Sequence, residues 1–274
     1  MKRIKKLIPN SIKIAFKSAL NPSLKKQQQE NARIQGLERY TPTTTTFLNK
    51  NLRITDNASF LFLKQELFEA QVYKFSCDSP EPFIIDCGAN VGLSIIYFKE
   101  IFPNASIIAF EPDEKVFDVL KFNIDSFKLE NVNLFQKACW SETTTLEFFS
   151  EGADGGRQAM KGDAIKRIEK VETIRLKDYL IRKVDFLKID IEGAELEVLK
   201  DAKENLNLVE KIFVEYHSFI GQEQCLPELL AILKDVGFRL HITAPGLTSI
   251  HPLVELNTYA GMDNQINIFG FREK

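Results

Sequence analysis

The sequence predicts a doubly wound α/β fold with a mainly parallel sheet, and three observations support this prediction. From residue 83 onward, short apolar segments alternate with amphipathic helical segments, the order expected of a parallel sheet covered by helices. Several apolar segments end in an acidic residue, and the first runs into a turn that contains Gly88 and Gly92. The 274 residues are enough for one large domain with a short extension.

The predicted elements follow the chain in this order. Residues 58–75 carry apolar positions at helical spacing, after an extended or linker stretch "TPTTTT". We then expect strands at 83–87, 106–112, 132–138, 184–190 and 211–216, and helices at 92–102, 113–127, 193–202 and 226–237. Segments 238–243 and 265–271 predict closing strands that form an antiparallel pair at one edge of the sheet, with an antiparallel edge strand. The interval 144–176 interrupts the alternation, and its Gly-rich loop at 151–160 is either a lid or a surface loop.

Composition and charge suggest three segments. Hydrophobic residues make up 44% and charged residues 27%, as in soluble globular proteins. Residues 1–30 contain eight Lys and Arg residues and a single acid, Glu30, while the remainder is acidic. This asymmetry argues against a nucleic-acid binder. We therefore expect a basic segment at 1–40, helical or flexible, a helical extension at 41–82 that packs on the core, and the main domain at 83–274.

Cysteine usage and hydropathy bear on location. The four cysteines form no C-x-x-C pair, so we expect free thiols in a reducing compartment rather than a disulfide or zinc site. The sequence has no apolar run of 18 residues, so no segment is expected to span a membrane. We predict a cytoplasmic protein. Its basic N-terminus either forms an amphipathic helix that contacts an anionic membrane surface or is a frayed tail.

Polar residues stand at the ends of the predicted strands. In doubly wound sheets, ligands bind beyond the carboxyl ends of the strands, near the point where the winding reverses. Core packing does not require an acid at these positions, so they predict a binding site. Four of the five strand ends carry an acid: Asp86, Glu111, Asp190 with Glu192, and Glu215 with His217. The third strand ends near Ala138 and Cys139.

The stretch "FIIDCGANVG" does not fit a dinucleotide site. A G-x-G-x-x-G motif beginning at Gly88 would have Asn90 and Leu93 where glycines are needed, and Asp86 would repel a pyrophosphate. A ligand with a cationic end suits this turn better, and S-adenosylmethionine is such a ligand. Glu111 follows Asp86 by 25 residues and is placed to accept both ribose hydroxyls. The alternatives are a helix-capping role for Asp86 and a surface position for Glu111.

Four stretches resemble the FkbM-type S-adenosylmethionine-dependent methyltransferases: "IIDCGANVGLSIIYF", "AFEPDEKVFDVLKFNI", "VNLFQKACWSE" and "VDFLKIDIEGAELEVLKDA". The resemblance runs from about Phe60 to about residue 217. It implies a class I methyltransferase fold, Rossmann-like, with seven strands, and O-methylation of a hydroxyl on a glycan, glycolipid or polyketide-derived acceptor. The cofactor-binding residues expected from it and from the strand ends are Asp86, Gly88, Ala89, Asn90, Gly92, Glu111, Pro112, Ala138 and Asp190.

Methyl transfer from a sulfonium is an in-line displacement, so the protein mainly aligns the reacting atoms, and a base near the hydroxyl should help. The candidate bases are His217, Asp190 and Glu215, and the sequence leaves the choice among them open. Glu192 and Arg157 are the expected substrate contacts. The stretch "DIEG" at 190–193 lacks the (Asp/Asn)-Pro-Pro-aromatic loop of enzymes that methylate nitrogen, which favours an oxygen acceptor.

Other interpretations of the same residues remain open. Asp190, Glu192, Glu215 and His217 include the hard oxygen ligands that suit a divalent cation, but their spacing fits no dedicated motif, so no metal is expected. A catalytically silent cofactor-binding protein is the main alternative, and a nicotinamide-dependent oxidoreductase is less favoured because its glycines are missing. The sequence determines neither the acceptor nor the oligomeric state.

Overall fold

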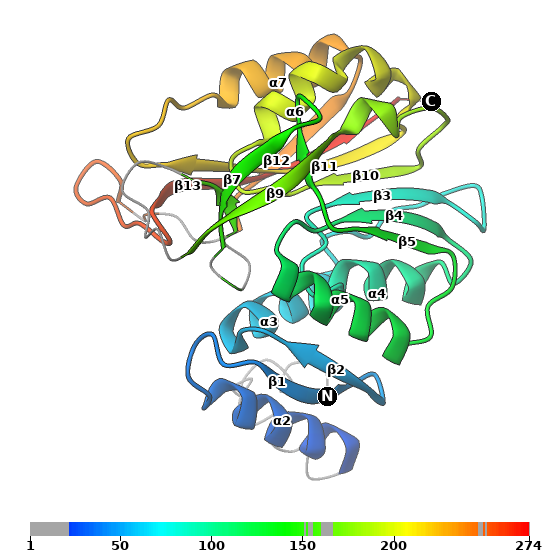
Figure 1. Cartoon of the computed structure of the whole chain (residues 1–274), viewed down its shortest axis with the longest axis vertical. Helices are drawn as coiled ribbons and strands as arrows, with labels where there is room; N and C mark the ends of the chain where they lie inside the picture. Colours follow the sequence, from blue (N-terminus) through cyan, green and yellow to red (C-terminus); the bar gives the residue numbers. More distant parts are fainter. Residues whose placement is uncertain are drawn as a thin grey trace, which may run out of the picture.

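The computed structural model describes residues 22–150, 152, 156–159, 167–245, 249 and 251–273. Residues 1–21 of the predicted basic segment and half of the predicted lid, residues 151, 153–155 and 160, lie outside the described residues. A central sheet is covered by helices α6 and α7 on one face and by α4 and α5 on the other (Figure 1). The N-terminal elements lie beyond α4 and α5 (Figure 1).

The elements have the following bounds. The N-terminal part contains α2 (Pro22–Gln35), β1 (Thr43–Phe47), β2 (Lys50–Ile54), α3 (Asn57–Lys64) and η2 (Gln65–Glu69). The first half of the main domain contains β3 (Phe83–Cys87), α4 (Leu93–Ile101), β4 (Ser106–Phe110), α5 (Glu114–Ser126), β5 (Val132–Phe135), β6 (Ala138–Trp140), β7 (Thr145–Phe149), β8 (Arg157–Gln158) and β9 (Ile168–Arg175). The second half contains η4 (Leu176–Asp178), β10 (Phe186–Ile189), α6 (Glu195–Ala202), η5 (Lys203–Leu208), β11 (Lys211–Phe219), α7 (Leu226–Asp235), β12 (Arg239–Thr243) and β13 (Met262–Phe271).

The central sheet has seven strands in the order β12-β13-β11-β10-β3-β4-β5. Neighbours from β11 to β5 pair in parallel, and β13 runs antiparallel to both β11 and β12. The predicted fold class is confirmed. The predicted antiparallel pair at the edge is present as β12 and β13. The strand that runs against the parallel ones is β13, however, which lies one place in from the edge and pairs with β11 from Lys211 to Phe219. The order of segments along the chain does not show this, because it does not fix which strands become neighbours in the sheet.

The helices bury two hydrophobic clusters, one on each face of the sheet. Strand β3 is buried at every position, as its continuous apolar pattern predicts for a strand covered on both faces. One cluster joins the α4 residues Ile95 and Phe98 to the N-terminal part. The other joins Leu199 of α6 to Leu233 of α7. Because both faces are filled by side chains, the carboxyl ends of the strands are the open part of the sheet.

The N-terminal part packs on the first cluster. Phe60 and Leu67 are 4% and 1% exposed there. The β1–β2 hairpin was not predicted, because its threonines were interpreted as a linker. The predicted helix at 58–75 ends earlier, in the π-helical turn η2. Asn123 of α5 ties the hairpin to the main domain by accepting from the Arg53 N–H and donating to the Arg53 carbonyl. The division of the chain at residues 40 and 82 stays a prediction.

A second sheet, in the order β6-β9-β7-β8, forms from the interval that interrupts the strand–helix alternation. The predicted strand at 132–138 is divided: β5 ends at Phe135, and β6 starts at Ala138 and pairs with β9 instead of β4. This sheet lies beside the carboxyl ends of the central strands (Figure 1). Within the part of the chain that the structure describes, no helix has the length and apolar character needed to cross a membrane.

Candidate active site

The turn after β3 is held in a left-handed conformation. Gly88, Asn90 and Gly92 have φ values of 88°, 49° and 89°. The Gly88 and Ala89 N–H groups both donate to the carbonyl of Phe110, which fixes the turn against the end of β4. A Cβ at Gly88 would lie 1.8 Å from the carbonyl oxygen of Asp190. Backbone segments that follow β3 and β10 therefore touch at this point, and only glycine permits the contact.

Gly88→Ala is expected to prevent stable folding or to lower the free energy of unfolding by more than about 3 kcal/mol, because the clash is with backbone that cannot rotate away. Gly221→Ala is the matched control: its φ is 81°, but a Cβ there would meet nothing within 4 Å. The control should lose only about 1–2 kcal/mol, the cost of a left-handed alanine. Urea unfolding of both variants measures the difference, and equal losses would contradict the close contact.

A pocket opens at the carboxyl ends of β3, β4 and β10. Its apolar wall comes from the N-terminal part and the second sheet, and includes Phe62, Leu63, Trp140, Leu146 and Phe148. Nine of the predicted site residues line it: Gly88, Ala89, Asn90, Glu111, Pro112, Ala138, Asp190, Glu192 and Glu215. Four others do not, namely Asp86, Gly92, His217 and Arg157.

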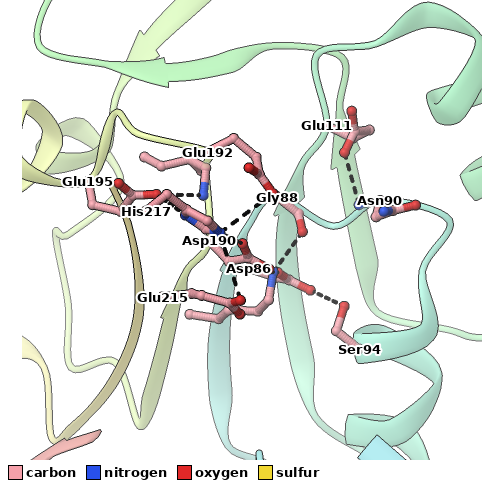
Figure 2. A network of polar contacts seen from close by, with 12 residues as sticks. Asp86, Gly88, Asn90, Ser94, Glu111, Asp190, Glu192, Glu195, Glu215 and His217 are labelled. Atoms are coloured by element: carbon pink, nitrogen blue, oxygen red, sulfur yellow. Dashed lines mark hydrogen bonds and ion pairs between the residues drawn. The ribbon is translucent and has the colours of Figure 1, made fainter. Parts of the chain in front are cut away.

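Glu111 stands on one side of the β3 turn (Figure 2). Its Oε2 accepts from the Asn90 N–H at 2.9 Å, and its Oε1 accepts from the Asp113 N–H at 3.0 Å. Each carboxylate oxygen has two lone pairs, so two acceptor positions remain. Burial raises the pKa of Glu111 to about 8, although the two backbone donors oppose this shift. The carboxylate is thus held firmly but is costly to ionise without a further partner.

Asp86 is fully buried behind the turn. Its Oδ2 accepts from the Ser94 hydroxyl at 2.5 Å, and its Oδ1 lies 3.2 Å from the Lys188 ammonium, as an ion pair outside hydrogen-bond geometry. Lys188 also lies 3.2 Å from Asp190 Oδ2 and donates to the Gly88 carbonyl at 2.7 Å. Burial would lower the pKa of Lys188, but Asp190 and Asp86 raise it above its usual range. The charge of Asp86 is therefore matched inside the protein.

The other side of the turn is strongly acidic. Asp190, Glu192, Glu195 and Glu215 gather around His217 (Figure 2). Burial, followed by the charge of Asp190, raises the pKa of Glu215 to about 8. Burial opposes protonation of His217, yet the carboxylates of Glu192 and Glu195 raise its pKa well above the usual value.

Strand β11 is longer than predicted. It runs to Phe219, so Glu215 and His217 lie within the strand rather than after its end. The extension follows from pairing with β13, which continues past Tyr216 to Phe219. Glu215 and His217 are two residues apart on one strand, so their side chains lie on the same face of the sheet. This shared face, not a strand end, brings both groups to Asp190.

Gly92 and Arg157 have structural contacts that explain why they stand outside the pocket. Gly92 precedes α4, and a Cβ there would lie 2.7 Å from Cδ1 of Leu120. The Arg157 guanidinium stacks over the rings of Phe149 and Phe219, at 4.9 and 5.5 Å from their centres. The predicted roles of both residues, and of the other site residues, stay predictions.

Among the other residues that line the pocket, three polar or charged ones that the sequence analysis did not single out bear on the site. Lys188 could have been found from the sequence, because a lysine inside the apolar run "VDFLKID" indicates a buried cation that needs acidic partners. Glu66, on the π-helical turn η2, has its pKa raised by burial to about 7. Gln265 of β13 donates to Glu215, and its Oε1 has no hydrogen-bond partner among the described residues. Neither of the last two carries a sequence signal, because each reaches the pocket from a distant part of the chain.

The seven-stranded sheet with one antiparallel strand, and a pocket at its carboxyl ends, define a class I methyltransferase fold. The model described as "Methyltransferase FkbM domain" matches residues 86–240. The chain therefore belongs to the FkbM methyltransferase family, and methyl transfer is the activity of that family.

Two relatives that are named methyltransferases are similar to this chain in sequence. The chain is 31% identical over 213 residues to "Methyltransferase sdnD" of Sordaria araneosa. This alignment covers 65% of this chain and 81% of that relative. It is 28% identical over 176 residues to "2-O-methyltransferase NoeI" of Sinorhizobium fredii. This alignment covers 57% of this chain and 71% of that relative. A crystal structure of a methyltransferase FkbM from Methylobacillus flagellatus aligns with a TM-score of 0.48 and 16% identity over 75% of this chain, which spans 47% of that chain.

Proposed function

We propose that the protein is an S-adenosylmethionine-dependent O-methyltransferase that acts on a hydroxyl of a glycan, glycolipid or similar acceptor. The observation that carries the proposal is the division of the pocket by the β3 turn, with the held carboxylate of Glu111 on one side and an acidic group on the other. The cofactor carries two ribose hydroxyls and a cationic end. This charge pattern matches the two sides of the turn.

The residues present fit the cofactor. Glu111 has two remaining acceptor positions for the ribose hydroxyls. Ala138 and Cys139 line the same pocket and offer an apolar surface to adenine. Asp190 lines the acidic side and offers a carboxylate to the cationic end. Asp86 then contributes indirectly, because it holds Lys188 between itself and Asp190.

When bound, the cofactor supplies an activated methyl group on a sulfonium. The chain's own residues would hold the acceptor in line with it, exclude water and take the hydroxyl proton. A base must reach that hydroxyl, and Asp190 and Glu215 line the pocket whereas His217 does not. We therefore assign the base to Asp190 or Glu215 and give His217 a positioning role.

Several observations favour oxygen as the methylated atom. The loop after β10 is acidic and carries no Pro-Pro-aromatic sequence of the kind that holds an amine or amide nitrogen. The relative from Sinorhizobium fredii is named a 2-O-methyltransferase.

The basic N-terminal segment suggests an acceptor at an anionic membrane face, where lipid-linked glycans would be within reach.

Incubation of the protein with S-adenosylmethionine and a panel of hydroxylated glycans is expected to release S-adenosylhomocysteine and to form a methyl ether. Glu215→Gln should lower kcat by about 100-fold or more if Glu215 is the base, while Glu197→Gln, on the exposed side of α6, should leave it unchanged. Mass spectrometry of the acceptor and the release of S-adenosylhomocysteine provide the measurement.

The outcomes separate the alternatives. Cofactor binding without S-adenosylhomocysteine for any acceptor would favour a catalytically silent binding protein. Binding of NADH in place of S-adenosylmethionine would refute the assignment. A methyl group found on nitrogen would leave the cofactor in place and overturn only the choice of atom.

A further inference from the structure

The side chains of Asp190, Glu192 and His217 point toward one another beside the pocket (Figure 2). His217 Nε2 lies 3.6 Å from Glu192 Oε1 and 3.8 Å from Asp190 Oδ1, and the three potential ligand atoms lie within 4.8 Å of one another. These separations are too long for hydrogen bonds. Two atoms that each ligate one cation at about 2.1 Å are about 3.0–4.2 Å apart, depending on the angle between them.

His217 gives an independent indication of a ligand. Its side chain is fully buried, and Nε2 has no hydrogen-bond partner among the described residues although it points into the carboxylate cluster. Nδ1, in contrast, lies 2.9 Å from Glu195 Oε1. With the Nδ1 proton donated to Glu195, a metal ion that displaces the Nε2 proton would meet a nitrogen lone pair directed at Asp190 and Glu192. A carboxylate that orients a histidine in this way is the usual outer partner of a metal-bound imidazole.

Glu195 is itself held in position. Its Oε1 accepts from the Gly193 N–H at 3.0 Å, and the Ile191 N–H lies at 3.4 Å from the same atom. The intervening residue, Glu192, has a φ of 54°, which is uncommon for a residue other than glycine. One short loop therefore presents Asp190 and Glu192 inward and also fixes the carboxylate that orients His217.

We propose that Asp190, Glu192 and His217 bind one divalent metal ion at the edge of the pocket. Two carboxylate oxygens and one imidazole nitrogen suit Mn²⁺ or Zn²⁺, whereas Ca²⁺ prefers six to eight oxygens. An ion would also offset the negative charge that four carboxylates place around His217. This departs from the sequence-based expectation of no metal, which rested on the absence of a known spacing.

Three protein ligands leave coordination positions open for water or a substrate oxygen. Because Asp190 and Glu192 line the pocket, at least one open position would face the acceptor. Resting on the proposed function, this gives the ion a specific use: it would orient the acceptor hydroxyl and lower its pKa. Glu215, 3.7 Å from His217 Nε2, would remain beside the ion to take the proton.

The test uses the full-length chain, stripped of metals with a chelator and titrated with Mn²⁺ alone, with no cofactor or acceptor. Electron paramagnetic resonance is expected to show one bound Mn²⁺ per chain, with a nitrogen coupling from an imidazole. Glu192→Gln should weaken binding by at least tenfold, and His217→Asn should abolish the nitrogen coupling. Glu195→Gln should weaken binding by about 10–100-fold as an outer partner. Glu197→Gln is the matched control and should bind as the wild type does.

Calorimetry with Zn²⁺ and with Ca²⁺ completes the comparison. Absence of Mn²⁺ and Zn²⁺ binding at millimolar concentration would overturn the proposal, and so would unchanged binding in both Glu192→Gln and His217→Asn. Preferential binding of Ca²⁺ would overturn the ligand set. The result is separate from the proposed function: a chain that binds S-adenosylmethionine but no metal refutes the metal site alone, and one that binds Mn²⁺ but no cofactor refutes the methyl-transfer site alone.

Discussion

Lys188→Met is expected to lower the free energy of unfolding by about 3–5 kcal/mol, the usual cost of removing one partner from a buried ion pair. Lys188 is 2% exposed, and it lies 3.2 Å from the fully buried Asp86 and 3.2 Å from Asp190. Methionine fills a similar volume but leaves Asp86 with the Ser94 hydroxyl as its hydrogen-bond donor. The carbonyl of Gly88 also loses a donor.

Urea unfolding of the full-length chain measures this effect. Lys200→Met removes a cation from an exposed pair with Glu197 and should cost less than about 1 kcal/mol. The double variant Lys188→Met with Asp86→Asn should recover part of the loss, because the uncompensated buried charge is then removed. A loss for Lys188→Met no larger than that for Lys200→Met would show that Asp86 does not depend on this cation.

Glu111→Ala is expected to weaken binding of 5′-methylthioadenosine by about 100-fold, because two hydrogen bonds from the ribose hydroxyls to a carboxylate would be lost. This ligand shares the adenine and ribose of S-adenosylmethionine but carries no amino-acid part, so the acidic side of the pocket contributes little. Calorimetry gives the affinities. Glu114→Ala, an exposed acid at the start of α5, is the matched control and should bind normally.

The same carboxyl predicts a pH dependence. Burial raises the pKa of Glu111 to about 8, and the form that accepts both hydroxyls is the ionised one. The affinity for 5′-methylthioadenosine should therefore rise about tenfold per pH unit below pH 8 and level off above it, with release of a proton on binding. The stability of the ligand-free chain should change in the opposite direction. Because the pKa of this carboxyl is raised on folding, the free energy of unfolding falls as pH rises from about 4.5 to 8. A flat affinity profile in the wild type, or an equal slope in Glu111→Gln, would contradict the assignment.

Much of the fold could be predicted because local patterns report it directly. The segment at 83–87 is a strand with the predicted bounds, since a continuous apolar run followed by a glycine turn has few other solutions. Helices α4 to α7 lie in the predicted segments for the same reason. The β1–β2 hairpin was missed, because a run of threonines has no alternation of apolar and polar residues. Its Phe47 is buried against Phe60 and Phe68, a contact that local sequence does not indicate.

The site was predictable to the extent that it follows from strand ends. Gly88, Asn90 and Glu111 line the pocket because parallel strands end at one edge of the sheet. Asp86 also ends a strand, but it faces inward to Lys188, and a strand end does not indicate which way a side chain points. Gln265 comes from β13, whose position beside β11 results from antiparallel pairing across almost 50 residues of chain.

The sequence by itself determined the family, the fold class and methyl transfer, because these depend on motifs and periodicities that are continuous along the chain. The tertiary structure decided which charges compensate one another and which face the pocket. It paired Asp86 with Lys188 and turned Nε2 of His217 toward Asp190 and Glu192. The physical reason is that the energy of a buried charge depends on the distance to its partners in space, and separation along the chain does not fix that distance.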